Sequence, residues 1–185
     1  MDKDWVDAYF THGVDVSNRR VFLDQDIEES TSGPLIKGLY LMETISKEPI
    51  EMFISSFGGC VYESLAIYDI MNTITCPIYT FGFGKIMSAA VLIIAAGEQG
   101  HRWVSPNASF MHHDWAAELE GKGQELHNTV KHLEHVNERW LKLLTKHTNK
   151  MITFWTNRSR RPSDFYFSAE EALDWGVADS MWVEK

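Results

Sequence analysis

The sequence predicts a single α/β domain built from βαβ units on a mainly parallel sheet, and three observations support this prediction. The chain has 185 residues, of which 44% are hydrophobic, so one domain can bury a substantial core. Short apolar runs alternate with segments whose apolar residues recur at three- and four-residue spacing. Glycines mark turns at residues 58–59 and 82–84. Such an alternation of strands and helices is typical of a parallel sheet covered by helices.

The first half of the chain contains two pairs of elements. After turn signals, residues 20–23 have the composition and length of a short strand, and residues 30–45 show helical spacing behind cap candidates. Residues 50–54 form an apolar run that ends in a glycine turn, and the spacing of residues 61–71 predicts another helix. A strand, a glycine turn and a helix therefore follow one another from residue 50 onward.

The second half repeats this pattern and adds one long helix. A strand over 78–83, a turn at Gly82 and Gly84, and a buried helix over 88–96 form the next unit. Further expected elements are strands at 103–104 and 109–113, an amphipathic helix over 122–147, a basic loop after Asn157, and a short helix capped by Ser168. The long helix is unusual in so small a domain.

Composition excludes several classes of protein. Two cysteines cannot form a disulfide framework, and no signal-peptide pattern follows Met1, so we expect a cytoplasmic, reducing location. The longest nearly apolar run, residues 87–97, has about half of the roughly 20 residues that a bilayer helix needs. A formal net charge of −9 disfavours nucleic-acid binding despite the basic run at 158–161. We therefore expect neither a membrane nor a nucleic acid as partner.

The chain offers candidates for the parts of a serine hydrolase, which needs a nucleophile, a base, an orienting carboxylate and amide donors for an oxyanion. Ser88 lies where a glycine turn enters an apolar helix, so the amide of Ala89 lies at the positive helix end. Gly58 and Gly59 can bring a second amide close to the same carbonyl, because neither has a side chain. Each glycine turn alone is equally compatible with plain turn geometry.

Histidine is the residue type most often used as the base, but the chain has eight histidines and most histidines are structural. His127, His132 and His135 lie along the long helix, where they could suggest a metal site. No cysteine or carboxylate completes a good ligand set with them, so a solvated helix face is the favoured interpretation. We expect no bound metal.

Position selects one of the remaining histidines. His112 and His113 are adjacent on a strand, so their side chains point to opposite faces and only one of them can reach Ser88. By the same alternation Asp114 faces away from His113. Asp114 is therefore a poor orienting carboxylate, which leaves room for one from a later loop, such as Asp164.

Four stretches of the chain, at residues 53–69, 84–97, 106–113 and 164–172, resemble motifs of the ClpP family in the family's order. Residues 53–61 (FISSFGGCV) and 66–69 (AIYD) resemble Y-I-N-S-P-G-G-S-V and A-I-Y-D. Residues 84–97 (GKIMSAAVLIIAAG) resemble G-x-A-A-S-M-G-A-x-L-L-A-A-G, and 106–113 (PNASFMHH) resemble P-N-S-R-I-M-I-H. Residues 164–172 (DFYFSAEEA) resemble D-x-F-x-S-A-E-E-A. Four motifs in the family's order are far more specific than any one of them.

The resemblance implies a serine endopeptidase that hydrolyses unfolded proteins to short peptides. The motif positions make Ser88 the nucleophile, His113 the base and Asp164 the carboxylate that orients it. Gly59 and Ala89 supply the amides of the oxyanion hole. This chemistry requires no cofactor in the chain.

The resemblance runs from about residue 20 to residue 183 and implies a ClpP/crotonase-type fold of stacked βαβ units. The helix at about 122–147 corresponds to the family's protruding handle, within a protease domain spanning 20–185. Residues 1–19 form a separate N-terminal segment, axial or mobile. Two stacked heptameric rings of this chain are implied, with an AAA+ Clp unfoldase that supplies ATP-driven unfolding. No segment matches the phosphate-binding pattern G-x-x-x-x-G-K-[S/T], which agrees with a separate ATPase.

The chain departs from the motifs around the candidate nucleophile. Phe57 replaces the proline before the two glycines, Ile86 and Met87 replace small residues, and Ala89 replaces the methionine after the serine. These departures keep a second interpretation open, in which the chain is a non-catalytic ring subunit that modifies a partner ClpP. A crotonase-type acyl-CoA hydratase or isomerase is a third, disfavoured because a serine, a histidine and an aspartate all occupy protease positions.

Overall fold

A single sheet with helices packed against it organises the chain in the computed structural model, which describes residues 9–160 and 163–182. The strands are β1 (Val14–Asp15), β2 (Arg20–Leu23), β3 (Ile50–Ser56), β4 (Ile78–Met87), β5 (Arg102–Val104), β6 (Ser109–His112), β7 (Phe165–Ser168) and β8 (Ser180–Met181). The helices are α2 (Glu29–Ile45), α3 (Val61–Thr73), α4 (Ala89–Ala95), α5 (Gly123–His147), α6 (Ile152–Ser159) and α7 (Ala169–Asp174).

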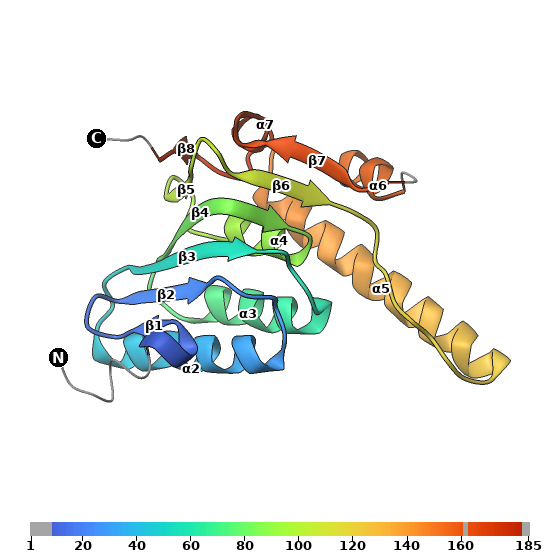
Figure 1. The fold of residues 1–185 in the computed structure, drawn as a ribbon, viewed down its shortest axis with the longest axis horizontal. Coiled ribbons are helices and arrows are strands. Elements are labelled where there is room, and N and C mark those ends of the chain that lie inside the picture. Colours follow the sequence, from blue (N-terminus) through green and yellow to red (C-terminus); the bar gives the residue numbers. More distant parts are fainter. Residues whose placement is uncertain (1–8, 161–162, 183–185) are drawn as a thin grey trace.

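The sheet is mainly parallel, as the sequence predicts. Its main path runs β1-β2-β3-β4-β5-β8, and β6 and β7 continue from β4 on a branch. The pairs β1·β2 and β6·β7 are antiparallel, whereas β2, β3, β4, β5 and β8 pair in parallel and β6 pairs in parallel with β4. Helices α2, α3 and α4 lie along one face (Figure 1). The predicted α/β fold class is therefore confirmed.

The strand β4 is longer than the sequence analysis predicts, and the expected turn at Gly82 and Gly84 is wrong. Thr80 to Gly82 pair with β5, whereas Lys85 to Met87 pair with β6, so one strand serves both branches of the sheet. Gly84 lies between the two pairings with a φ of 65°, a backbone conformation that glycine adopts without strain. The glycine bends the strand instead of ending it, and β4 thereby delivers Ser88 to the branch point.

The core is centred on α4, which is buried at every residue. Its aliphatic side chains include Leu92, Ile93 and Ile94, all fully buried between the sheet and neighbouring helices. Burial of each such side chain stabilises the fold by about 1.5–3 kcal/mol relative to exposure. The N-terminus of α4 is therefore held firmly, which fixes the backbone of Ser88.

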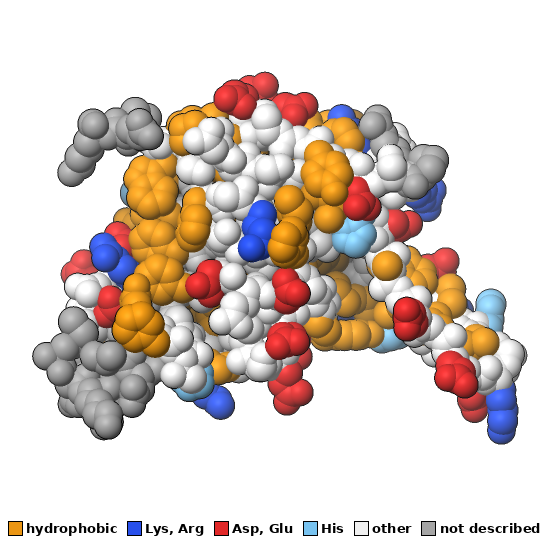
Figure 2. Space-filling view, viewed as in Figure 1, with side chains coloured by type: hydrophobic (Ala, Val, Ile, Leu, Met, Phe, Trp, Pro, Cys, Tyr) orange, Lys and Arg blue, Asp and Glu red, His pale blue; other side chains and the backbone are white. Residues whose placement is uncertain are grey.

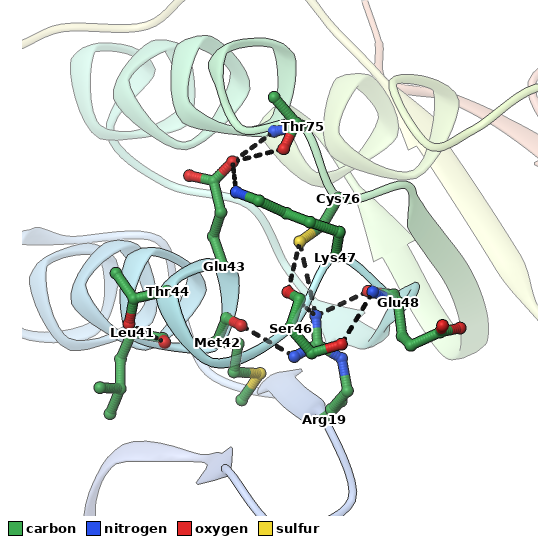
Figure 3. A network of polar contacts seen from close by, with 10 residues as sticks. All are labelled: Arg19, Leu41, Met42, Glu43, Thr44, Ser46, Lys47, Glu48, Thr75 and Cys76. Atoms are coloured by element: carbon green, nitrogen blue, oxygen red, sulfur yellow. Dashed lines mark hydrogen bonds and ion pairs between the residues drawn. The ribbon is translucent and has the colours of Figure 1, made fainter.

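An arginine near the N-terminus ties the end of α2 to the start of β3. Arg19 has a φ of 55°, and its guanidinium donates hydrogen bonds to four backbone carbonyls and contacts a cysteine sulfur. The acceptors, several of which are drawn in Figure 3, are Met42, Ser46, Glu48, Pro49 and Cys76 Sγ. One cation thus binds the last turn of α2 and the carbonyls of the segment that connects it to β3.

The expected N-terminal segment at residues 1–19 is only partly described. Residues 1–8 lie outside the described residues, whereas Val14 and Asp15 form β1 and pair with β2.

A row of stacked aromatic rings crosses the sheet. The rings of Phe22, Phe53, Phe81 and Trp103, on β2, β3, β4 and β5, stack at centroid distances of 4.9–5.2 Å. In Figure 2, hydrophobic side chains gather on the left of the visible face. No described helix is long and apolar enough to cross a membrane.

The long helix α5 protrudes from the body of the molecule (Figure 1). Only residues of its C-terminal half are buried, namely Val136, Trp140, Leu141 and Leu144. Val130 and Leu133 on the outer half are partly covered. The prediction of an amphipathic helix over 122–147 is confirmed within one residue, and its apolar stripe is completely buried only near the sheet.

Candidate active site

Ser88 sits in a strained turn between β4 and α4. Its φ of 52° and ψ of −123° are unusual for a residue with a side chain, and such strain is typical of functional sites. Its N–H donates a hydrogen bond of 2.8 Å to the carbonyl of Met111 on β6. The β4·β6 pairing therefore holds the serine backbone beside the strand that leads to His113.

His113 follows the last residue of β6 and faces Ser88. The distance between His113 Nε2 and Ser88 Oγ is 2.7 Å, which is hydrogen-bonding distance. A neutral imidazole whose Nε2 is unprotonated accepts the hydroxyl proton at this position. The two side chains therefore have the geometry of a nucleophile and its general base.

Two glycines bring the end of β3 against Ser88. Gly58 has a φ of 90°, and a Cβ there would lie 2.6 Å from the carbonyl oxygen of Met87 and 2.7 Å from Ser88 Cβ. Ile27 donates a hydrogen bond to the carbonyl of Gly58 and accepts one from the N–H of Cys60. Within the described residues, this leaves the N–H of Gly59 without an acceptor.

The amide of Ala89 is the other free donor of the site. As the first residue of α4, Ala89 has no carbonyl one turn earlier within the helix, and its N–H has no acceptor among the residues that the structure describes. Ser88, His113, Gly59 and Ala89 all line one cavity. Two unpaired amides beside a serine hydroxyl are what an oxyanion requires.

The cavity beside Ser88 has a volume of about 310 Å³. Its wall is formed mainly by apolar side chains from α3, the segment after β6, and α5, which include Val61, Tyr62, Trp115, Leu133 and Trp140. Phe57, which replaces the motif proline, is 58% exposed, and the ammonium of Lys85 lies 4.5 Å from its ring centroid. This departure from the motif therefore does not fill the cavity.

Asp164 is not joined to His113 by a hydrogen bond in the described part of the chain. It is exposed and directly precedes β7. The ladder between β6 and β7 ends with His112 opposite Phe165, so His113 and Asp164 are the next residues along the two strands. Directly opposed residues of an antiparallel pair share one face, so a continuation of this register by one residue would place Asp164 opposite His113.

The side chains of His112 and Asp114 form hydrogen bonds with residues other than Ser88. The His112 side chain is buried beneath β6, and burial lowers its pKa to about 4. The carboxylate of Asp114 accepts hydrogen bonds of 3.0 Å from the N–H of Trp115 and 3.1 Å from the side-chain amide of Asn137. Neither side chain competes with His113 for the serine.

His132 on α5 contacts a side chain of α3. His132 Nε2 lies 3.1 Å from the hydroxyl of Tyr62, and the two rings stack. No group of three or more potential metal ligands occurs among the described residues.

Ser56 supports the glycine turn but is not predicted by the sequence analysis. Its hydroxyl donates a hydrogen bond of 2.6 Å to the carbonyl of Gln25 and accepts one of 3.0 Å from the N–H of Gly58. Its only sequence signal is its place just before the glycine turn.

The fold is an α/β sheet that places a serine, a histidine and two unpaired amides around one cavity, an arrangement that serine hydrolases also use. Residues 7–185, essentially the whole chain, match the family model of Clp protease. The chain belongs to the Clp protease family, and its mixed α/β structure agrees with the ClpP fold. The resemblance seen in the four sequence motifs is thereby confirmed.

Proposed function

We propose that this chain is a ClpP-like serine endopeptidase that hydrolyses unfolded proteins to short peptides. The observation that carries the proposal is the 2.7 Å contact between Ser88 Oγ and His113 Nε2 beside two free amides. Ser88 attacks a peptide carbonyl while His113 accepts its proton. The amides of Gly59 and Ala89 stabilise the oxyanion, and His113 then protonates the leaving amine.

Water completes the reaction by the same chemistry. His113 removes a proton from water, which attacks the acyl-enzyme, and the Ser88 oxygen leaves with that proton. Asp164 orients the imidazole when its carboxylate turns toward the Nδ1 side of His113. The reaction needs no cofactor within the chain, and the register of β6 and β7 supports the role of Asp164.

The proposal includes an assembly of two stacked heptameric rings and a separate AAA+ Clp unfoldase. Support comes from the protruding outer half of α5, whose Val130 and Leu133 are only partly covered, and from the half-buried stacked rings on the sheet, since apolar surface that is not fully covered can mark an interaction site. An enclosed chamber shields the sites from folded chains. Unfolding a domain costs about 5–15 kcal/mol, which peptide hydrolysis inside a chamber cannot supply to a substrate outside it.

A comparison of a short peptide and a folded protein as substrates tests this function directly. We expect the purified protein to cleave a fluorogenic peptide without nucleotide, and to degrade a stable folded reporter only with a Clp-type unfoldase and ATP. Peptide fluorescence and loss of the reporter on a gel measure the two activities. Rapid loss of the folded reporter with the purified chain alone would reject the enclosed chamber. Failure on both substrates with a matched unfoldase would favour the non-catalytic ring subunit.

The outer half of α5 should carry the contact between rings. Val136 is buried by its own chain and Leu133 lines the cavity, so Val130 is the cleanest position to test. We expect Val130→Glu to lower the native mass to single rings or smaller species, because the charge would be buried without a partner. Native mass spectrometry measures this, with the exposed position Asn128→Glu as control. A particle of full mass in Val130→Glu would refute the assignment of the handle.

A further inference from the structure

A second serine and histidine pair lies buried behind the candidate active site. The hydroxyl of Ser159 is 2.7 Å from His112 Nε2, and the same nitrogen lies 3.3 Å from the carbonyl oxygen of Trp155. Only 2% of His112 and 4% of Ser159 is exposed. The ring of His112 stacks on Trp140 at 5.7 Å and meets Trp155 edge to face. One imidazole thus joins β6, α5 and α6.

The hydrogen bonds of His112 and Ser159 contribute to the stability of the fold because the two side chains are buried among apolar groups. A buried imidazole without hydrogen-bond partners destabilises the folded state, so His112 favours the arrangement in which Ser159 and Trp155 are close. The motif carries an isoleucine at the position of His112, which could pack there but could not select a hydrogen-bonding partner. The nearby guanidinium of Arg158 adds to burial in disfavouring the cationic form of His112. The pair is therefore a neutral, directional link between β6 and α6.

Both ends of this link lead into the candidate triad. On one side, His113 directly follows His112 along the chain. On the other side, Ser159 is the last residue of α6, and Asp164 comes five residues later. Five residues span at most about 18 Å, so the position of Ser159 limits where Asp164 can lie. The link between His112 and Ser159 therefore lies close in sequence both to the candidate base, His113, and to the candidate carboxylate, Asp164.

We propose that His112 and Ser159 are positioning residues that fix the end of α6 against β6 and so restrict the positions that Asp164 can take relative to His113, a role that rests on the proposed function. Neither side chain contacts the serine nucleophile. Their contribution is to hold the register in which His113 and Asp164 succeed the pair His112 and Phe165. Without the link, the carboxylate would sample more positions and orient the base for a smaller fraction of the time.

Acylation of His113 by diethyl pyrocarbonate tests this role without requiring turnover. The reagent modifies neutral imidazole, and a nearby carboxylate favours the charged form. We expect Asp164→Asn to raise the acylation rate of His113 about 3- to 10-fold near pH 6, and Ser159→Ala to raise it in the same range. Peptide mass mapping measures the rate at His113. Ser64→Ala is the matched control, because Ser64 is a fully buried helical serine with a bond to its own helix.

A second variant covers the case in which Ser159→Ala fails to fold. His112→Ile combined with Ser159→Ala removes both side chains of the pair, so that neither is left without the other, and should raise the rate equally. The role is overturned if Asp164→Asn raises the rate while the folded pair variants match the wild type. It is also overturned if Asp164→Asn itself has no effect. Peptide hydrolysis by the wild type is measured in parallel, and its absence alongside the acylation shifts would reject the proposed function and leave the link standing.

Discussion

Replacing Ser88 with alanine is expected to lower kcat for peptide hydrolysis by about 10⁴-fold or more and to abolish labelling by a fluorophosphonate. The change removes the hydroxyl that lies 2.7 Å from His113 Nε2. It removes one oxygen atom and little packing volume, so the fold and the assembly should persist. A fluorogenic peptide assay measures turnover, and mass mapping of the labelled protein identifies the modified residue.

Ser109→Ala is the matched control for this experiment. Ser109 is an exposed serine on β6 and lies outside the cavity lined by Ser88. This variant should keep wild-type turnover and labelling. If Ser88→Ala still hydrolysed peptides at the wild-type rate, another residue would be the nucleophile and the proposed mechanism would be wrong. If the wild-type protein folds but is not labelled at Ser88, the non-catalytic ring subunit becomes the better interpretation.

The elements that the sequence predicts well are those with a strong local signal. Residues 50–54 and 61–71 carry the two periodicities of a strand and a helix, separated by a glycine turn, and both elements exist. By contrast, β1 and β8 have two residues each, which is too short for any pattern. Helix α6 was missed because β-branched and aromatic residues, which are weak helix formers, dominate its first half. Full burial of Trp155 stabilises this helix through packing.

The strand β7 and the end of β4 depend on contacts that are distant in sequence. Phe165 to Ser168 form a strand because they pair with β6, which precedes them by more than fifty residues. Residues Lys85 to Met87 remain in β4 because β6 provides a new partner where β5 ends. The sequence alone predicts a turn at Gly84. Because β4 pairs with β5 before Gly84 and with β6 after it, the glycine instead bends a continuous strand.

For the candidate site, the sequence predicts the side of the strand to which a side chain points better than it predicts which residue that side chain contacts. Strand alternation correctly places His113 toward Ser88 and His112 away from it. It does not reveal that His112 meets Ser159, because α6 itself was not predicted. The link between β6 and α6 is therefore visible only after the chain has folded. The position of Asp164 depends in turn on that link.

Asp164→Asn is expected to lower kcat by about 10³- to 10⁴-fold with little change in KM, since an orienting carboxylate acts on the imidazole and does not bind the peptide. Asparagine preserves size but cannot stabilise the imidazolium that forms in the transition state. Asp114→Asn is the control, because Asp114 accepts its hydrogen bonds from Trp115 and Asn137 and an amide oxygen can still accept both. It should cost less than about 10-fold. Steady-state kinetics on one fluorogenic peptide compares the two variants, and a larger loss in Asp114→Asn than in Asp164→Asn would mean that the third member of the triad is misassigned.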